Sequence, residues 1–259
     1  MNLSDIFIGI FQILKLDFEK FVIIYNSIPT DFAWIFFIFF CYTTILIFLK
    51  FFGAAGLYIF SVIAIIVANI QLLKLVKFSF FLDPIPLGTV LFASTFLCTD
   101  ILTEHYGPIK ARKNVLIGFS GFLLMTLLML FTLGFSPVDI KIQNTLSSIF
   151  LPLPIFFAAS MIAYLSSQFF DIWFFSTISN LTNKRFLWLR NNVSTIFSSL
   201  LDNIVFSIFA WFIFNPNPKD FYTILIYIFG TYILRIMIAI IDTPFLYLSK
   251  YFLPNNRDE

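Results

Sequence analysis

TDILTEHYGPIKARK, residues 99–113, ends an apolar segment of membrane length with acidic side chains and then continues into basic ones. Its acidic part contains Asp100 and Glu104, with His105 next to them. The whole chain of 259 residues is 60% hydrophobic and only 12% charged, with a mean hydropathy of +0.95. Soluble domains are about one-quarter charged. The composition therefore predicts an integral membrane protein, and the question is why carboxylates stand at the end of such a segment.

Seven apolar segments approach or exceed the roughly 20 residues that a helix needs to cross the hydrocarbon core. They cover residues 32–49, 51–73, 85–103, 114–135, 150–178, 193–214 and 221–248. The fold class is therefore an all-α polytopic membrane protein, a bundle of about seven transmembrane helices, with six or eight as alternatives. The third segment contains Gly88 and the seventh contains Pro244, so either is a candidate for a broken or re-entrant helix.

Before the first span, apolar residues recur at helical spacing among charged ones from Phe7 to Tyr25. This pattern indicates an amphipathic helix that lies in the membrane interface. No basic flank or small-residue cleavage site accompanies it, so a cleaved signal peptide is not expected. We divide the chain into an amphipathic N-terminal segment (1–31), a transmembrane domain (32–250) and a short polar tail (251–259).

The distribution of Lys and Arg predicts the orientation in the membrane. One side would carry nine basic residues, Lys50, Lys110, Arg112, Lys113, Lys184, Arg185, Arg190, Lys250 and Arg257, and the other six, Lys15, Lys20, Lys74, Lys77, Lys141 and Lys219. This bias predicts an external N-terminus and a cytoplasmic C-terminus. The net charge of +2 arises from these loops and indicates no nucleic-acid partner.

Polar side chains at membrane depth cost about 2.5–3.5 kcal/mol each on insertion scales, so they usually face a cavity, a partner or a pathway. Asp100 and Glu104 on the third span are four residues apart and share a helix face. The alternative is an interfacial pair that answers Lys110 and Arg112. The fifth span carries Gln168 and Asp171 on one face, with Trp173 close by, although such a Trp is also an ordinary interface residue.

The sixth span carries a polar stripe of Ser194, Ser198 and Asp202, with Asn203 adjacent and Arg190, Asn191 and Asn192 at its start. Serines in such a stripe are often helix-packing contacts. The seventh span places Thr231, Arg235 and Asp242 on nearly one face, and a structural Arg–carboxylate pair is the plain explanation. Four spans thus each present a carboxylate, which favours a polar central cavity.

Motifs of common enzymes are missing from the chain. It has no phosphate-binding G-x-x-x-x-G-K-[ST] loop, no G-x-S-x-G and no H-E-x-x-H. His105 is the only histidine, so we expect a solvated turn residue rather than a metal ligand or triad member. Cys41 and Cys98 lie in apolar stretches and predict neither a disulfide nor a metal pair. We expect no catalytic residue, metal or cofactor, and a transporter or binding subunit is favoured over an enzyme.

Four stretches together resemble, in order and spacing, the queuosine precursor transporter family of bacterial inner-membrane proteins, which are similar to vitamin uptake transporters. They are FLCTDILTEHYGPIKARK (96–113), AYLSSQFFDIWFF (163–175), LWLRNNVSTIFSSLLDNIVF (187–206) and IDTPFLYL (241–248). The resemblance implies import of 7-cyano- and 7-aminomethyl-7-deazaguanine, or of queuine, for the queuosine of tRNA. Ser199 and Asn203 stand where the family has Gln and Thr, so substrate preference can differ.

A guanine-like edge offers two adjacent donors to a carboxylate and a carbonyl to a donor. We therefore expect substrate binding by Asp171 or Asp202 at the donor edge, by Gln168, Asn192 or Asn203 at the carbonyl, and by Trp173 through stacking, with Arg190 and Asn191 nearby. Asp100, Glu104, Arg235 and Asp242 are candidates for a gate or proton path. The expected partners are the deazapurine and the lipid bilayer. The alternatives are the membrane-embedded binding subunit of an energy-coupling transporter and, in another class, an intramembrane enzyme that uses Asp100, Glu104 and His105.

Overall fold

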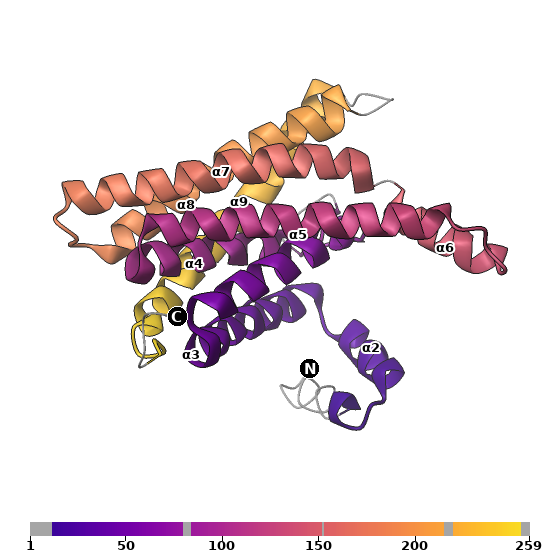
Figure 1. Cartoon of the computed structure of the whole chain (residues 1–259), viewed down its shortest axis with the longest axis horizontal. Coiled ribbons are helices and arrows are strands. Elements are labelled where there is room, and N and C mark those ends of the chain that lie inside the picture. The colour runs from indigo at the N-terminus through magenta and orange to yellow at the C-terminus, as the bar shows by residue number, and fades with distance from the viewer. Residues whose placement is uncertain (1–11, 80–83, 152, 215–219, 255–259) are drawn as a thin grey trace.

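The computed structural model describes residues 12–79, 84–151, 153–214 and 220–254. Its helices are α2 (Phe18–Ser27), α3 (Thr30–Gln71), α4 (Thr89–Tyr106), α5 (Pro108–Gly134), α6 (Ile140–Phe150), α7 (Leu153–Leu181), α8 (Leu187–Ser207), the π-helix η1 (Ile208–Ile213) and α9 (Phe221–Ser249). Two short strands, β1 (Leu75–Val76) and β2 (Ile85–Pro86), form an antiparallel pair between α3 and α4. The long helices form one bundle (Figure 1), which confirms the all-α class.

Helix α3 contains a sharp bend at Gly53. Its 42 residues would extend about 63 Å as a straight helix, twice the thickness of the hydrocarbon core. Gly53 has φ 57° and ψ −136°, a backbone conformation that residues with a Cβ rarely adopt. The chain turns back at this residue, so α3 is a helical hairpin with limbs 30–52 and 54–71 (Figure 1).

The predicted spans coincide with helices. The two limbs of α3, with α4, α5, α7, α8 continued by η1, and α9, cover the seven apolar segments of the sequence. Within the described residues, α3, α5, α8 with η1, and α9 are long and apolar enough to cross a membrane. The chain is therefore a multi-pass membrane protein, and the exact count of seven crossings stays a prediction. The third and seventh spans, α4 and α9, are continuous rather than broken.

Helix α4 lies at the centre of the bundle. All its residues from Thr89 to Leu102 are buried, and it packs against α3, α5, α7 and α9. A helix that is buried on all sides needs no polar face toward solvent. The polar side chains of α4 must therefore find partners on the surrounding helices.

Several connections meet at one end of the bundle. A Cβ on Gly53 would lie 3.4 Å from Pro254 and 3.5 Å from the Tyr106 hydroxyl, so the α3 bend, the end of α4 and the C-terminal residues are neighbours. The Lys50 ammonium also lies over the Phe252 ring, 6.0 Å from its centroid. The turn between α7 and α8 lies at the same end (Figure 1). The loops predicted to share one side of the membrane thus share one end of the molecule.

The N-terminal segment is described only from residue 12. Asp17 caps the N-terminus of helix α2, and its carboxylate accepts a hydrogen bond from the Lys20 amide at 3.2 Å. Its apolar residues Phe18, Val22 and Ile23 are exposed, and none of its residues is buried. This surface is compatible with an interfacial position, which stays a prediction. Residues 1–11 and the end of the tail, 255–259, lie outside the described residues.

The bend at Gly53 gives the first testable prediction. Gly53→Ala forces a Cβ into a backbone conformation that costs about 1–3 kcal/mol, so we expect a lower thermal unfolding midpoint in detergent. Gly134→Ala is the matched control, because Gly134 is exposed in α5 and no atom lies within 4 Å of its added Cβ. Equal midpoints for the two variants would show that the bend does not require glycine.

Candidate functional site

Buried polar side chains of α4, α7, α8 and α9 face one another along the bundle. They include Thr95, Thr99, Asp100, Ser167, Gln168, Asp171, Arg190, Asn191, Thr195, Ser198, Asp202, Arg235 and Asp242, all at most 8% exposed. On each helix they recur at intervals of three, four or seven residues, apart from the adjacent pairs Thr99–Asp100, Ser167–Gln168 and Arg190–Asn191, so they occupy one broad face. We call this set the polar column. It runs parallel to α4, over a length of about 27 Å for 18 residues.

An ion pair joins α8 to α9 in the polar column. The Arg235 guanidinium donates from Nη1 to Asp202 Oδ2 at 2.5 Å, and Ser167 of α7 donates to Asp202 Oδ1 at 3.0 Å. Arg235 also lies over the Phe92 ring of α4, 5.1 Å from its centroid. The Arg–carboxylate pair expected for the seventh span thus exists, and its carboxylate comes from the sixth span.

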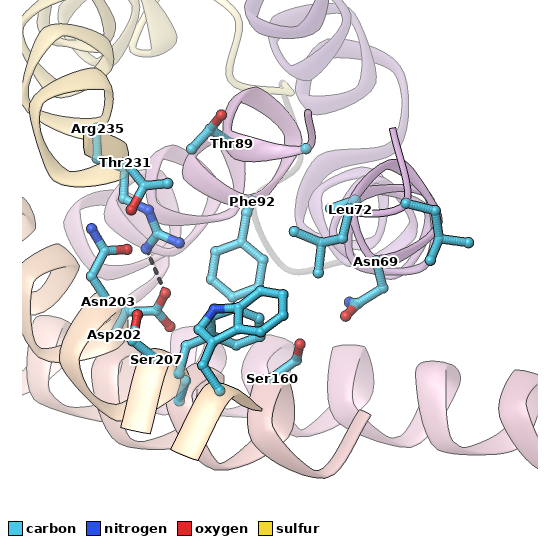
Figure 2. Close-up of a pocket in the computed structure, with 16 residues that line it drawn as sticks. Asn69, Leu72, Thr89, Phe92, Ser160, Asp202, Asn203, Ser207, Thr231 and Arg235 are labelled. Atoms are coloured by element: carbon cyan, nitrogen blue, oxygen red, sulfur yellow. Dashed lines mark hydrogen bonds and ion pairs between the residues drawn. The ribbon is translucent and has the colours of Figure 1, made fainter. Parts of the chain in front are cut away.

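A pocket opens around this ion pair. The empty space along its walls is about 890 Å³, a volume that includes open solvent at its mouth. Figure 2 shows Arg235 and Asp202 pointing toward each other on one side, with Phe92, Asn69 and Ser160 nearby. The lining also includes Leu72, Thr89, Asn203, Ser207, Trp211 and Thr231. Its lining is mostly apolar apart from these polar side chains, and it lies toward the end of the bundle where α4 begins, so the polar central cavity expected from the sequence stays a prediction.

Two local features shape this pocket. Residues 208–213 form the π-helix η1, in which the Phe214 amide donates to the Phe209 carbonyl at 2.8 Å, and π-helical turns are frequent at functional sites. The wider turn carries Trp211, which lines the pocket. Gly88 lies at the opposite wall with φ 107°, and a Cβ there would come within 2.7 Å of the Ala68 carbonyl oxygen. Glycine thus permits the close approach of the α4 start to the α3 end.

The middle of the polar column is closely hydrogen-bonded. Gln168 donates to Thr95 Oγ1 at 2.9 Å and accepts from Thr99 Oγ1 at 3.0 Å, which ties α7 to α4. Asp171 Oδ1 accepts from Ser198 Oγ of α8 at 2.8 Å. Gln168 and Asp171 share a face as expected, but neither lines the pocket.

The far end of the polar column contains a second ion pair. Arg190 of α8 pairs with Glu104 of α4, and its guanidinium lies over the Phe175 ring of α7, 5.3 Å from the centroid. The alternative in which Asp100 and Glu104 answer Lys110 and Arg112 is therefore wrong. Glu104 pairs with a cation from a helix that is distant in the sequence. The first turn of α8 points Arg190 into the bundle, where Arg190 is 1% exposed.

Amide side chains connect α8 to α9 beside this ion pair. Asn191 donates to Asp242 Oδ1 at 2.7 Å, and Asn192 donates to Thr243 Oγ1 at 2.7 Å. Asn191, Asn192 and Arg190 thus lie at the opposite end of the column from the pocket. Asp202 and Asn203 are the two expected substrate-binding residues that line the pocket, and Arg235 from the predicted gate joins them.

Trp173 and His105 lie apart from the pocket. Trp173 is 54% exposed on the outside of α7, where it stacks with Phe174, with ring centroids 5.9 Å apart. This is the position of a lipid-facing aromatic. His105 Nε2 lies 2.8 Å from Ser249 Oγ, so this histidine contacts α9 instead of being a free turn residue.

Several pocket residues carried no signal in the sequence. Leu72, Phe92 and Trp211 belong to apolar runs, and helical periodicity does not separate a residue that faces a pocket from one that faces lipid. Asn69 is the exception among the pocket residues, because it is an amide within an apolar span and a search for amides at membrane depth would find it. Its Oδ1 atom is buried without a hydrogen-bond donor.

The apolar helices define a multi-pass membrane protein, and an ion pair buried between them at the wall of a pocket is typical of the transporter class. The family model described as "Putative vitamin uptake transporter" matches residues 86–249. The "Probable queuosine precursor transporter" of Bacillus subtilis (strain 168) is 36% identical over 227 residues, which cover 86% of this chain and 96% of that protein. The chain belongs to the queuosine precursor transporter family, which confirms the resemblance of its four motifs. No solved structure matches the chain.

The Asp202–Arg235 ion pair gives a prediction about stability. Asp202→Asn leaves the Arg235 charge buried without its counter-ion, a loss of about 3–5 kcal/mol, so the thermal unfolding midpoint falls. The double variant Asp202→Asn, Arg235→Gln removes both charges and recovers part of the loss. Arg112→Gln, at an exposed position of α5, is the control and leaves the midpoint unchanged. A double variant whose loss equals the sum of the single losses would show that the two side chains are not coupled.

Proposed function

We propose that the protein imports queuosine precursors, 7-cyano-7-deazaguanine and 7-aminomethyl-7-deazaguanine or queuine, across the bacterial inner membrane, and that the base binds in the pocket beside Asp202 and Arg235. The transported class follows from the family. The observation that carries the site is a carboxylate and a guanidinium side by side in a buried pocket between helices. Membrane-embedded ionisable residues of this kind usually mark a transport path.

The polar groups of the pocket complement a guanine-like edge. Such an edge presents a carbonyl next to a ring N–H and an exocyclic amine, that is, one acceptor beside two donors. Asp202 is an acceptor for the two donors, and Arg235, whose Nε is buried without an acceptor, is a donor for the carbonyl. Asn203 and Asn69 offer further amide contacts. A neutral base can approach this pair without leaving either charge unpaired.

The apolar wall of the pocket suits a planar ring. Phe92 of α4 and Trp211 of η1 both line it. Stacking of a base on an aromatic side chain contributes about 1–3 kcal/mol to the binding free energy. In this proposal they take the stacking role that the sequence suggested for Trp173. Asp202 takes the donor edge, and Asp171, the other candidate, belongs to the middle of the polar column.

The distribution of Lys and Arg predicts the orientation of the chain in the membrane. We propose an external N-terminus and a cytoplasmic C-terminus, because the end that carries the α3 bend, the α4–α5 turn and the C-terminal residues is the richer in Lys and Arg. A fluorescent protein fused after residue 259 is then expected to fluoresce, and alkaline phosphatase fused there is expected to be inactive. The opposite pair of results would reverse the orientation.

The test of function uses a bacterium that cannot make queuosine precursors and lacks its own importer. Expression of this chain with a limiting supply of 7-deazaguanine base is expected to restore queuosine in tRNA. Asp202→Asn is expected to lower uptake by about tenfold or more, because hydrogen bonds to a charged group contribute about 1.5–3 kcal/mol. Asp139→Asn is the matched control, since this exposed residue caps α6 and Asn retains the cap. Membrane levels are measured for each variant, and equal uptake by Asp202→Asn would remove Asp202 from the site.

Purified protein in lipid vesicles separates this proposal from its two alternatives. A single-polypeptide carrier takes up the base without other proteins. A binding subunit of an energy-coupling transporter would bind the base and take up none until its partner subunits are added. An intramembrane enzyme would convert the base without moving it.

A further inference from the structure

Three buried carboxyl groups of the polar column have no cationic partner. Asp100 of α4, Asp171 of α7 and Asp242 of α9 are each at most 1% exposed. Among the described residues, the two buried guanidinium groups are engaged elsewhere, Arg235 with Asp202 and Arg190 with Glu104. An ionised carboxylate in a low-dielectric interior costs several kcal/mol unless it is paired. Three such charges close together would also repel one another, so the cluster requires bound protons.

The hydrogen bonds around Asp100 and Asp171 leave room for one shared proton. Thr195 donates to Asp100 Oδ2 at 3.4 Å, and Ser198, one turn further along α8, donates to Asp171 Oδ1 at 2.8 Å. The other oxygen of each group, Asp100 Oδ1 and Asp171 Oδ2, is buried and has no donor. Thr195 and Ser198 stand three residues apart on one face of α8, so the two carboxyl groups that they bind lie side by side. A proton between them satisfies both oxygens and reduces the charge of the pair to −1.

A neutral side chain beside this pair also lacks a donor. Asn191 is fully buried and donates from Nδ2 to Asp242 Oδ1, yet its own Oδ1 has no hydrogen-bond donor. The second oxygen of Asp242 is likewise unpartnered. An amide carbonyl can be satisfied only by a group that carries a hydrogen. A protonated Asp242 would be such a donor, as would any other O–H or N–H group beside it.

Side chains of the surrounding helices lie around the pair of Asp100 and Asp171. They are Ser194, Thr195 and Ser198 of α8, Asp242 of α9 and Cys98 of α4 itself, and Tyr42 of α3 interacts electrostatically with Asp242. The nearest ion pair is Glu104–Arg190, in which Glu104 lies one helical turn beyond Asp100 and Arg190 directly precedes Asn191. Glu104 keeps about 24% of its side chain exposed, so it connects the buried pair with water at that end of the bundle.

The pair is also one helical turn from the pocket. Asp202 follows Ser198 by four residues on α8, and Ser167, which donates to Asp202, precedes Asp171 by four residues on α7. Gln168 bonds both Thr95 and Thr99, and Thr99 adjoins Asp100. A shift of α7 or α8 that accompanies binding in the pocket would therefore also change the contact between the two carboxyl groups.

We propose that Asp100 and Asp171 form a proton-binding site in which two carboxyl groups share one proton, and that this proton crosses the membrane together with the base. The inference rests on the proposed transport function. The proton comes from water on one side and returns to water on the other, so no bond other than O–H is made or broken. The membrane proton gradient then supplies the energy for accumulation.

The experiment uses purified full-length protein in lipid vesicles with radiolabelled 7-aminomethyl-7-deazaguanine, a cation, and 7-cyano-7-deazaguanine, which is neutral. Uptake is compared at equal pH and with an inward proton gradient of one pH unit, with the membrane potential clamped at zero. Coupling to one proton predicts about tenfold accumulation of the neutral base, because one pH unit corresponds to about 1.4 kcal/mol. In Asp171→Asn and in Asp100→Asn, the ratio of uptake with the proton gradient to uptake at equal pH is expected to fall to about one. Asp139→Asn keeps the wild-type ratio.

A second measurement does not depend on transport, and its decisive outcome needs only the wild-type protein. The infrared band of a protonated carboxyl group is expected in the wild-type protein at neutral pH and should be weaker in both Asp→Asn variants. A wild-type protein that shows this band and moves no base would overturn the proposed function and leave the proton site standing. A wild-type protein that moves the base with equal rates under both conditions, or that responds to a sodium gradient at equal pH, would overturn the proton coupling. Absence of the band would overturn the shared proton itself.

Discussion

The cost of charge in a low-dielectric interior is the constraint on which the structure depends. Every ionised group inside the bundle needs a partner, and the partners lie on different helices. Asp202 with Arg235 joins α8 to α9, and Glu104 with Arg190 joins α4 to α8. Between apolar helices in lipid the hydrophobic effect provides little preference for one packing over another. These buried polar contacts therefore determine which helix faces meet.

The central position of α4 follows from the same constraint. Its Thr95, Thr99 and Asp100 can be satisfied only from the surrounding helices, and α7 and α8 provide Gln168 and Thr195. The hydrogen-bonded middle of the polar column separates a pocket at one end from an ion pair at the other. A transporter needs such a separation, because a site that is open to both sides at once would leak. In the proposed transport function, breaking or remaking a few buried contacts in this middle section switches access.

The sequence could predict which faces are polar, but it could not predict how they meet. Helical spacing placed Gln168 with Asp171, and Ser198 with Asp202, on shared faces, and the structure confirms both pairs. The partner of Glu104 was missed because Arg190 lies 86 residues further along the chain. Trp211 was missed for a different reason. In a chain whose outer surface is also apolar, an aromatic that lines a pocket and one that faces lipid look alike, and only the packing separates them.

The central claim is that a 7-deazaguanine base binds beside Asp202 and Arg235. The most direct measurement is an experimental structure of the purified protein with 7-cyano-7-deazaguanine bound. The account predicts density for the base in the pocket, with its donor edge toward the Asp202 carboxylate and its ring against Phe92 and Trp211. Density for the base elsewhere, for example beside Asp171 and Asn191, with this pocket unchanged, would contradict it.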